Sequence, residues 1–195
     1  IRAVHLDYLK AGADIITSAS YQATFQGFAR RGYDHAQSVA LMQRSITLAL
    51  EARDEFWADP ANRVGRQRPL VAASVGPYGA MLADGSEYRG HYGLTIEQLM
   101  DFHRERLAIF LNAGADLLAC ETLPCPEEAI ALGRLLAEEF PPAAAWIRFP
   151  CCAAHHVSQG ERLHECLAQL SGFAQIVHRP FDIIRLFSES YHESR

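Results

Sequence analysis

The tetrapeptide Ala-Gly-Ala-Asp occurs twice in the chain, and it constrains the fold more than any other sequence feature. The copies are residues 11–14 and 113–116, and each follows apolar residues at helical spacing. Each copy leads directly into a short apolar run, at 15–19 and 117–121. The glycine suits the left-handed conformation that ends many helices. Two helix–turn–strand units of this kind predict a βα repeat with a parallel sheet.

The rest of the chain continues the alternation of helices and strands. A long helix is expected over residues 36–57, because Asp34 and Gln37 can form a capping box at its start. Thr95 and Gln98 predict a second capped helix in the same way. The other expected elements are strands at 69–75, 144–149 and 175–177 and helices from Pro126 and over 161–171. Short strands that are apolar on both faces fit an open doubly wound sheet or a (β/α)₈ barrel.

Polar residues cluster where the predicted strands end, and in both architectures the carboxyl ends of the strands line the functional site. Glu121 closes an otherwise apolar strand, so its carboxylate points either into a site or to solvent. The strand-end position favours the site. The other polar positions of this kind are Ser18, Ser20, Tyr21, Gln22, residues 74–79 and Thr122.

The segment 77–93 holds four glycines and three tyrosines, and it has no clear helical or strand pattern. We expect a long irregular loop, which is either a flexible surface excursion or a lid over a ligand. Tyrosine faces attract cations, so the clustered tyrosines favour a lid over a cationic ligand.

Composition narrows the class of protein. The formal net charge is −5, and no basic stripe is present, which argues against nucleic acid as a partner. The sequence has no apolar run that could span a membrane, and its five cysteines have no regular spacing. Phosphate-binding glycine motifs and a nucleophile elbow are also missing. These features indicate a cytoplasmic globular protein.

Cysteines lie near one another at two places in the chain, but Cys120 and Cys125 are five residues apart, which is not a metal-binding spacing. Cys151 and Cys152 precede His155 and His156, but no scaffold or third ligand is evident around them. Cys120 lies in an apolar strand and is expected to be a packed core thiol. We assign no metal ligand in this chain.

Several ordered motifs lie at residues 8–14, 17–24, 74–79, 83–90 and 120–124. They resemble the homocysteine S-methyltransferases, most closely the bacterial and plant enzymes that use S-methylmethionine or S-adenosylmethionine as donor. The likeness is clear over residues 1–147. The resemblance implies methyl transfer from a sulfonium donor to the thiol of homocysteine, giving methionine. It also implies a (β/α)₈ TIM-type barrel, here incomplete, with about five of the eight βα units present.

By the same resemblance, Glu121 binds the amino group of homocysteine, and Tyr21 and Gln22 line the substrate pocket. Tyr78, Tyr88 and Arg89 fall on the segment that covers the donor. The family holds zinc with three cysteines in sequence contexts that this chain lacks. We therefore expect zinc in the intact family member and none in this chain, and we assign no catalytic residue here.

The resemblance also divides the chain into residues 1–177, a partial homocysteine-binding barrel, and residues 178–195, a divergent tail. The family's first strand is expected to precede Ile1. Likeness is lost at 148–154 and again after 177, which suggests altered reading frames. Three functions remain open: a methyltransferase fragment, a non-catalytic remnant of that family, and an unrelated barrel enzyme for a small anionic substrate. Open barrel edges would also allow self-association.

Overall fold

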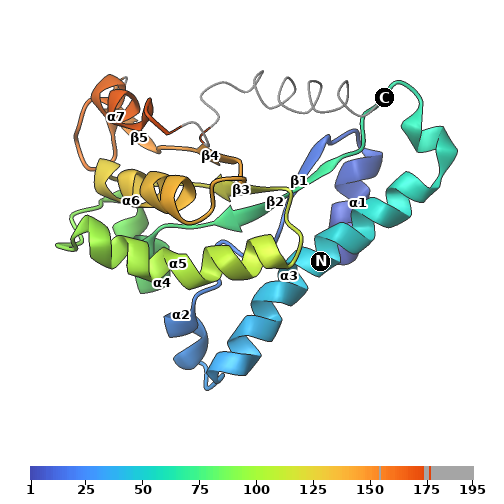
Figure 1. The fold of residues 1–195 in the computed structure, drawn as a ribbon, viewed down its shortest axis with the longest axis horizontal. Helices are drawn as coiled ribbons and strands as arrows, with labels where there is room; N and C mark the ends of the chain where they lie inside the picture. The colour runs from blue at the N-terminus through green and yellow to red at the C-terminus, as the bar shows by residue number, and fades with distance from the viewer. Residues whose placement is uncertain (154, 174–175, 177–195) are drawn as a thin grey trace.

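A four-stranded parallel sheet forms the centre of the computed structural model, which describes residues 1–153, 155–173 and 176. Its strands are β1 (Ile15–Thr17), β2 (Leu70–Val75), β3 (Leu117–Cys120) and β4 (Ala145–Ile147). Their order in the sheet is β1-β2-β3-β4, the order of the chain (Figure 1). A doubly wound sheet would reverse its strand order at a switch point, so this arrangement is part of a barrel wall.

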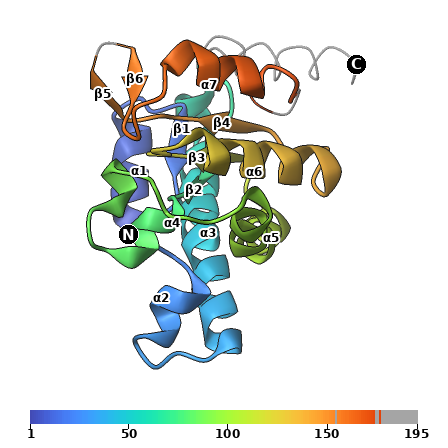
Figure 2. The same cartoon turned by 90° about the vertical axis from the view of Figure 1, so that its left-hand side faces the viewer.

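Helices lie between the strands and pack in sequence against one another. α1 contacts α3, α3 contacts α5, α5 contacts α6 and α6 contacts α7, as Figures 1 and 2 show. The helices are α1 (Arg2–Lys10), α2 (Phe25–Ala29), α3 (His35–Ala58), α4 (Tyr78–Leu82), α5 (Ile96–Asn112), α6 (Pro126–Glu138) and α7 (Leu163–Leu170). Short 3₁₀ turns, η1 (Pro60–Arg63) and η2 (Ser86–Tyr88), and an antiparallel hairpin of β5 (Cys151–Ala153) and β6 (His156–Val157) complete the described elements.

Alternate strand residues face opposite sides of the sheet, as a pleated strand requires. Val71 packs with core residues of α1 and α3, whereas Ala73 and Val75 join the core beneath α3, α5 and α6. Ala72 lies on the other face, in a small separate cluster with Leu117 and Ala119. In a barrel this second face is the interior, where the functional side chains gather at the carboxyl end.

The repeated Ala-Gly-Ala-Asp motif ends a helix and starts a strand in both copies, as predicted. Gly12 and Gly114 have φ values of +107° and +96°, which glycine adopts without a side-chain clash. The carboxylate of Asp116 accepts hydrogen bonds from the amide of Val71, at 2.7 Å, and from Arg53, at 2.8 Å. The second copy of the motif therefore also fixes the start of the neighbouring strand.

Both capping boxes predicted from the sequence are present, at Asp34 with Gln37 and at Thr95 with Gln98. The prediction of an irregular segment at 77–93 was wrong, because this segment contains α4 and η2. The amide of Tyr78 at the start of α4 donates to the Glu128 carboxylate at 2.6 Å. That partner lies far along the chain, so no local sequence signal marks the helix.

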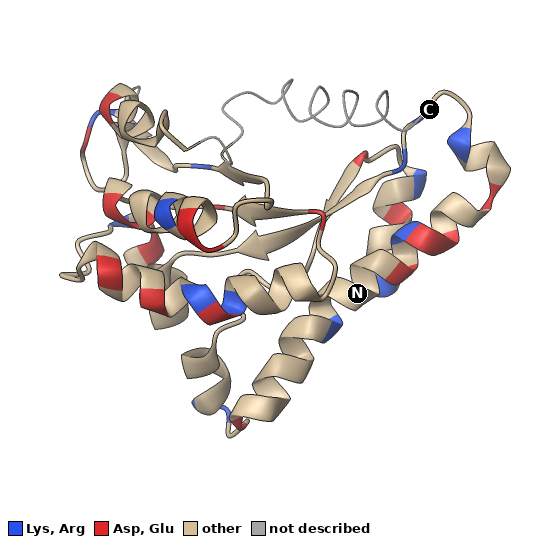
Figure 3. Ribbon diagram, viewed as in Figure 1, with Lys and Arg blue, Asp and Glu red and all other residues tan. Residues whose placement is uncertain are grey.

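Other expectations are met in part by the described residues. A fifth strand was expected at 175–177, and there Ile176 forms a parallel bridge to Ala145. Residues 175 and 177 lie outside the described residues, as does the expected tail at 178–195. No helix in the described part of the chain has the length and apolar character of a membrane span. Figure 3 shows acidic and basic residues interspersed along α3 and α5.

Candidate functional site

A carboxylate and a hydroxyl meet at the carboxyl end of the sheet. Glu121 directly follows β3, and its Oε2 accepts a hydrogen bond of 3.0 Å from Oγ of Ser74 in β2. Strand alternation places both side chains on the face of Ala72 and Ala119, away from the helices. Glu121 is half-buried, and its Oε1 accepts no hydrogen bond from the residues that the structure describes. This oxygen can accept a bond from a ligand.

Three buried serines connect the ends of β1 and β2 beneath this carboxylate. The hydroxyls of Ser18 and Ser20 lie 2.6 Å apart, and Ser20 donates to the carbonyl of Ser74 at 2.7 Å. The amide of Ser74 donates in turn to Oγ of Ser18 at 3.1 Å. The segment that follows β1 is thereby fixed against the end of β2.

Tyr21 lies on that segment, close to both Glu121 and Tyr88. Burial raises the pKa of Tyr21 to about 12, while a hydrogen bond with Thr122 opposes the rise and the nearby Glu87, Tyr88 and Glu121 add to it. The phenol therefore keeps its proton at neutral pH and can donate a hydrogen bond. The structure brings together three of the residues predicted for the site, Tyr21, Tyr88 and Glu121.

The backbone next to Glu121 is in an unusual conformation. Thr122 has a φ of +61°, in the left-handed region that a β-branched residue rarely adopts. Its side chain is half-buried and contacts the phenol of Tyr21. Backbone strain of this kind concentrates at functional sites.

The remaining predicted residues differ in their surroundings. The Gln22 side chain donates to the carbonyl of Ala80 in α4 at 3.3 Å. The ring of Tyr78 packs against Tyr92 and Phe102, with centroid distances of 5.3 and 5.1 Å. Tyr78 therefore supports the core beneath the 77–93 segment.

On the same segment, Tyr88 is 60% exposed, and Arg89 is an exposed side chain that contacts the carbonyl of Asp84 at 3.1 Å.

Sequence reasoning missed a group of buried ionisable side chains behind the site. His103 and Arg106 of α5 and Glu128 of α6 are all buried. His103 Nε2 lies 2.8 Å from Oε1 of Glu128, and Arg106 donates to the carbonyl of Gly76 at 3.1 Å. Burial lowers the pKa of His103, although Glu128 opposes this, so the imidazole is neutral near pH 7. The available signal was the position of residues 103 and 106 on the apolar stripe of their helix.

The cysteines in the described residues do not offer a zinc site. Burial raises the pKa of Cys120 to about 12, which confirms a packed core thiol rather than a ready thiolate. Cys151 and Cys152 are exposed on β5, and the Cys152 thiol contacts the carbonyl of Val157 at 3.2 Å. Within residues 1–153, 155–173 and 176, no three His, Cys, Asp or Glu side chains are placed to share a metal ion.

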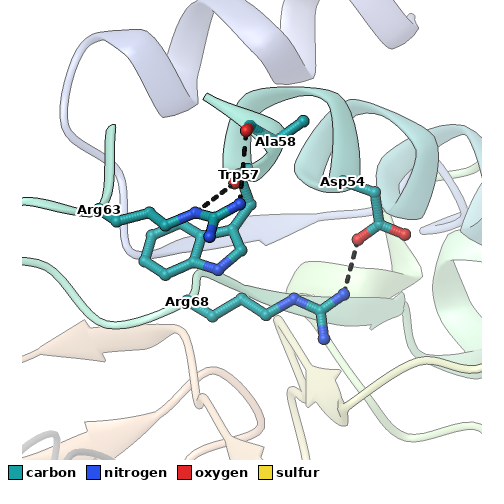
Figure 4. Close-up of a pocket in the computed structure, with 5 residues that line it drawn as sticks. All are labelled: Asp54, Trp57, Ala58, Arg63 and Arg68. Atoms are coloured by element: carbon teal, nitrogen blue, oxygen red, sulfur yellow. Dashed lines mark hydrogen bonds and ion pairs between the residues drawn. The ribbon is translucent and has the colours of Figure 1, made fainter. Parts of the chain in front are cut away.

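A pocket of about 290 Å³ lies at the opposite end of the sheet, where α3 ends and the chain leads into β2 (Figure 4). Arg63 donates to the carbonyls of Trp57 and Ala58, and Arg68 pairs with Asp54 at 2.7 Å. The two arginines thus form hydrogen bonds with backbone carbonyls and a carboxylate in the last turns of α3. This pocket is not continuous with the Glu121 site.

Comparison with known proteins agrees with this arrangement. The family model described as homocysteine S-methyltransferase matches residues 1–183. The chain belongs to the homocysteine S-methyltransferase family. The homocysteine S-methyltransferase YbgG of Bacillus subtilis is 51% identical over 176 residues, which cover 90% of this chain and 56% of that protein. The Escherichia coli homocysteine S-methyltransferase is 50% identical over 186 residues, 95% of this chain and 59% of that protein.

Solved structures of this family match the fold as well. The metallated form of the homocysteine methyltransferase MmuM from Escherichia coli has a TM-score of 0.85 and 51% identity, covering 90% of this chain and 60% of that one. Its apo form has a TM-score of 0.74. The chain thus spans little more than half the length of these homocysteine S-methyltransferases.

Proposed function

We propose that the protein containing this chain transfers a methyl group from a sulfonium donor to the thiol of homocysteine, giving methionine. The observation that carries the proposal is the half-buried carboxylate of Glu121, which Ser74 holds at the carboxyl end of the sheet. An oriented carboxylate with a free oxygen is suited to the ammonium group of an amino-acid substrate. The family membership of the chain supports homocysteine as that substrate.

The surroundings of Glu121 suit two amino-acid ligands, one of them cationic. The protonated phenol of Tyr21 can donate to a substrate carboxylate or orient a bound amine. The carboxylates Glu87 and Glu121 both act on Tyr21, so the site has negative charge that attracts a sulfonium. The exposed Tyr88 and Arg89 lie on the segment proposed to cover the donor, and Gln22 joins that segment to the loop after β1.

In this proposal the described residues bind and orient the substrates, as the larger part of a barrel domain assigned to residues 1–177. Zinc is proposed for the complete protein, held by cysteines that the described residues do not supply. When bound, zinc lowers the pKa of a coordinated thiol and so yields a thiolate nucleophile. The remaining proposals are a cytoplasmic location, small molecules rather than nucleic acid as partners, and self-association through the barrel edges.

A chimaeric enzyme tests the proposal directly. In the E. coli homocysteine S-methyltransferase, the matched 186 residues would be replaced by those of this chain. Methionine formation from homocysteine would then be measured with S-methylmethionine and, separately, with S-adenosylmethionine. We expect turnover with at least one donor, compared with the unaltered E. coli enzyme. A folded, zinc-loaded chimaera without turnover would identify this chain as a non-catalytic remnant.

A further inference from the structure

Arg106 of α5 is the largest fully buried side chain among the described residues, with 1% of its surface exposed. Burial lowers its pKa to about 10, so the guanidinium is still charged at neutral pH. No carboxylate in the described part of the chain forms an ion pair with it, and Glu128, which pairs with His103, acts on its charge only from a greater distance. A buried charge without an ion pair is costly unless its hydrogen bonds compensate. The contacts of Arg106 therefore indicate what this side chain does.

The guanidinium holds two loops at the carboxyl end of the sheet. Its Nη1 donates to the carbonyl of Gly76 at 3.1 Å, and its Nη2 lies 3.4 Å from the carbonyl of Tyr21. The amide of Gly76 also donates to the Tyr21 carbonyl, at 3.1 Å. A Cβ atom at Gly76 would lie 2.5 Å from that same oxygen, so only glycine permits this approach. One buried guanidinium thus contacts both the loop after β1 and the loop after β2.

Arg106 also supports the start of α4, which follows the loop after β2. Its guanidinium lies over the ring of Phe102, 5.5 Å from the centroid, and that ring packs against Tyr78. Tyr78 starts α4, whose Ala80 carbonyl accepts from the Gln22 side chain. The two loops that carry Tyr21, Gln22 and Tyr78 therefore meet at one arginine.

We propose that Arg106 is a positioning residue, which holds the loops after β1 and β2 at the separation that substrate binding requires. Its planar fork presents one nitrogen to each carbonyl in a fixed geometry, whereas lysine offers a single nitrogen at the end of a flexible stem. The claim that Arg106 affects substrate binding rests on the proposed function. The claim that Arg106 holds the two loops does not rest on it, and the two claims can be tested separately.

Hydrogen–deuterium exchange of the chimaeric enzyme, with and without homocysteine, measures both parts. In Arg106→Met and Arg106→Lys, we expect amide exchange in residues 20–24 and 76–82 to rise at least about tenfold. The protection that homocysteine gives these residues should be lost. Arg53→Lys is the matched control, because Arg53 is a buried arginine that binds Asp116 at the other end of the sheet. It should raise exchange near residue 71 and leave both loops unchanged.

The outcomes separate the two proposals. Wild-type exchange in both loops of Arg106→Lys, or an equal rise throughout the chain, would overturn the positioning role. A rise confined to the loops supports it, and the lysine variant keeps the test valid if the methionine variant does not fold. If homocysteine protects no residue of the unsubstituted, zinc-loaded chimaera while the loops still respond to the substitutions, the proposed substrate fails and the positioning role of Arg106 remains.

Discussion

The side chain of Glu121 can be tested by removing its carboxylate. In the chimaeric enzyme, Glu121→Ala should raise the KM for homocysteine about tenfold to a hundredfold, with a much smaller effect on the donor. Loss of a charged hydrogen bond to the substrate ammonium costs about 1.5–3 kcal/mol, which accounts for this range. Steady-state kinetics with each substrate varied in turn would measure the difference.

Ser74→Ala is the control for Glu121, because it leaves the carboxylate in place and removes only its hydrogen-bond donor. It should cause a smaller change of the same kind. Equal losses for homocysteine and donor in Glu121→Ala would instead assign Glu121 a role in supporting the fold.

Thr122 offers a test of backbone strain next to the site. Thr122→Gly should raise the free energy of unfolding by about 0.5–1 kcal/mol. Relief of about 1–2 kcal/mol of left-handed strain exceeds the added chain entropy of glycine, about 0.5–1 kcal/mol. Urea unfolding of both proteins would measure the change. Ala83→Gly, at a φ of 58°, is the comparison, with a smaller gain expected because alanine is not β-branched. A destabilised Thr122→Gly would show that the contact with Tyr21 outweighs the strain.

At the scale of elements, the two Ala-Gly-Ala-Asp motifs have the same sequence but different surroundings. Asp116 binds the Val71 amide and Arg53, whereas Asp14 binds Arg66 with a side chain that is 80% exposed. Asp116→Ala should therefore lower the free energy of unfolding by about 2–3 kcal/mol, and Asp14→Ala by less than about 1 kcal/mol. Urea unfolding of the two variants gives the comparison. Equal losses would show that the hydrogen bonds of Asp116 to Val71 and Arg53 contribute little.

The elements that the sequence predicted well are those whose signals are local. Asp34 and Thr95 each have their capping partner three residues away, so the starts of α3 and α5 could be predicted. α4 could not, because its first amide is bound by Glu128, 50 residues further on. The strand-end rule predicted Glu121 at the carboxyl end of the sheet, where the structure has it. The rule does not apply to Arg106, which lies inside α5, and only the position of residue 106 on the apolar stripe of that helix indicates its burial.

At the scale of the whole molecule, the 195-residue chain should bind less than one zinc per chain and transfer no methyl group. Its buried thiols resist deprotonation, and the exposed Cys151 and Cys152 have no third ligand among the described residues. Elemental analysis of the purified chain and an assay of methionine formation would measure both. One zinc per chain, with turnover abolished by Cys151→Ser or Cys152→Ser, would contradict the prediction and make that pair the metal site.

The sequential order of the strands has a consequence for how the protein forms. Among the described elements, every strand of the parallel sheet pairs with the strands next to it in the chain. Such pairing limits strand contacts to consecutive βα units, and domains generally fold from the N-terminal side during synthesis. The sheet can therefore lengthen by one strand for each βα unit that leaves the ribosome. A partial barrel like this one would then be a stage that a growing chain passes through.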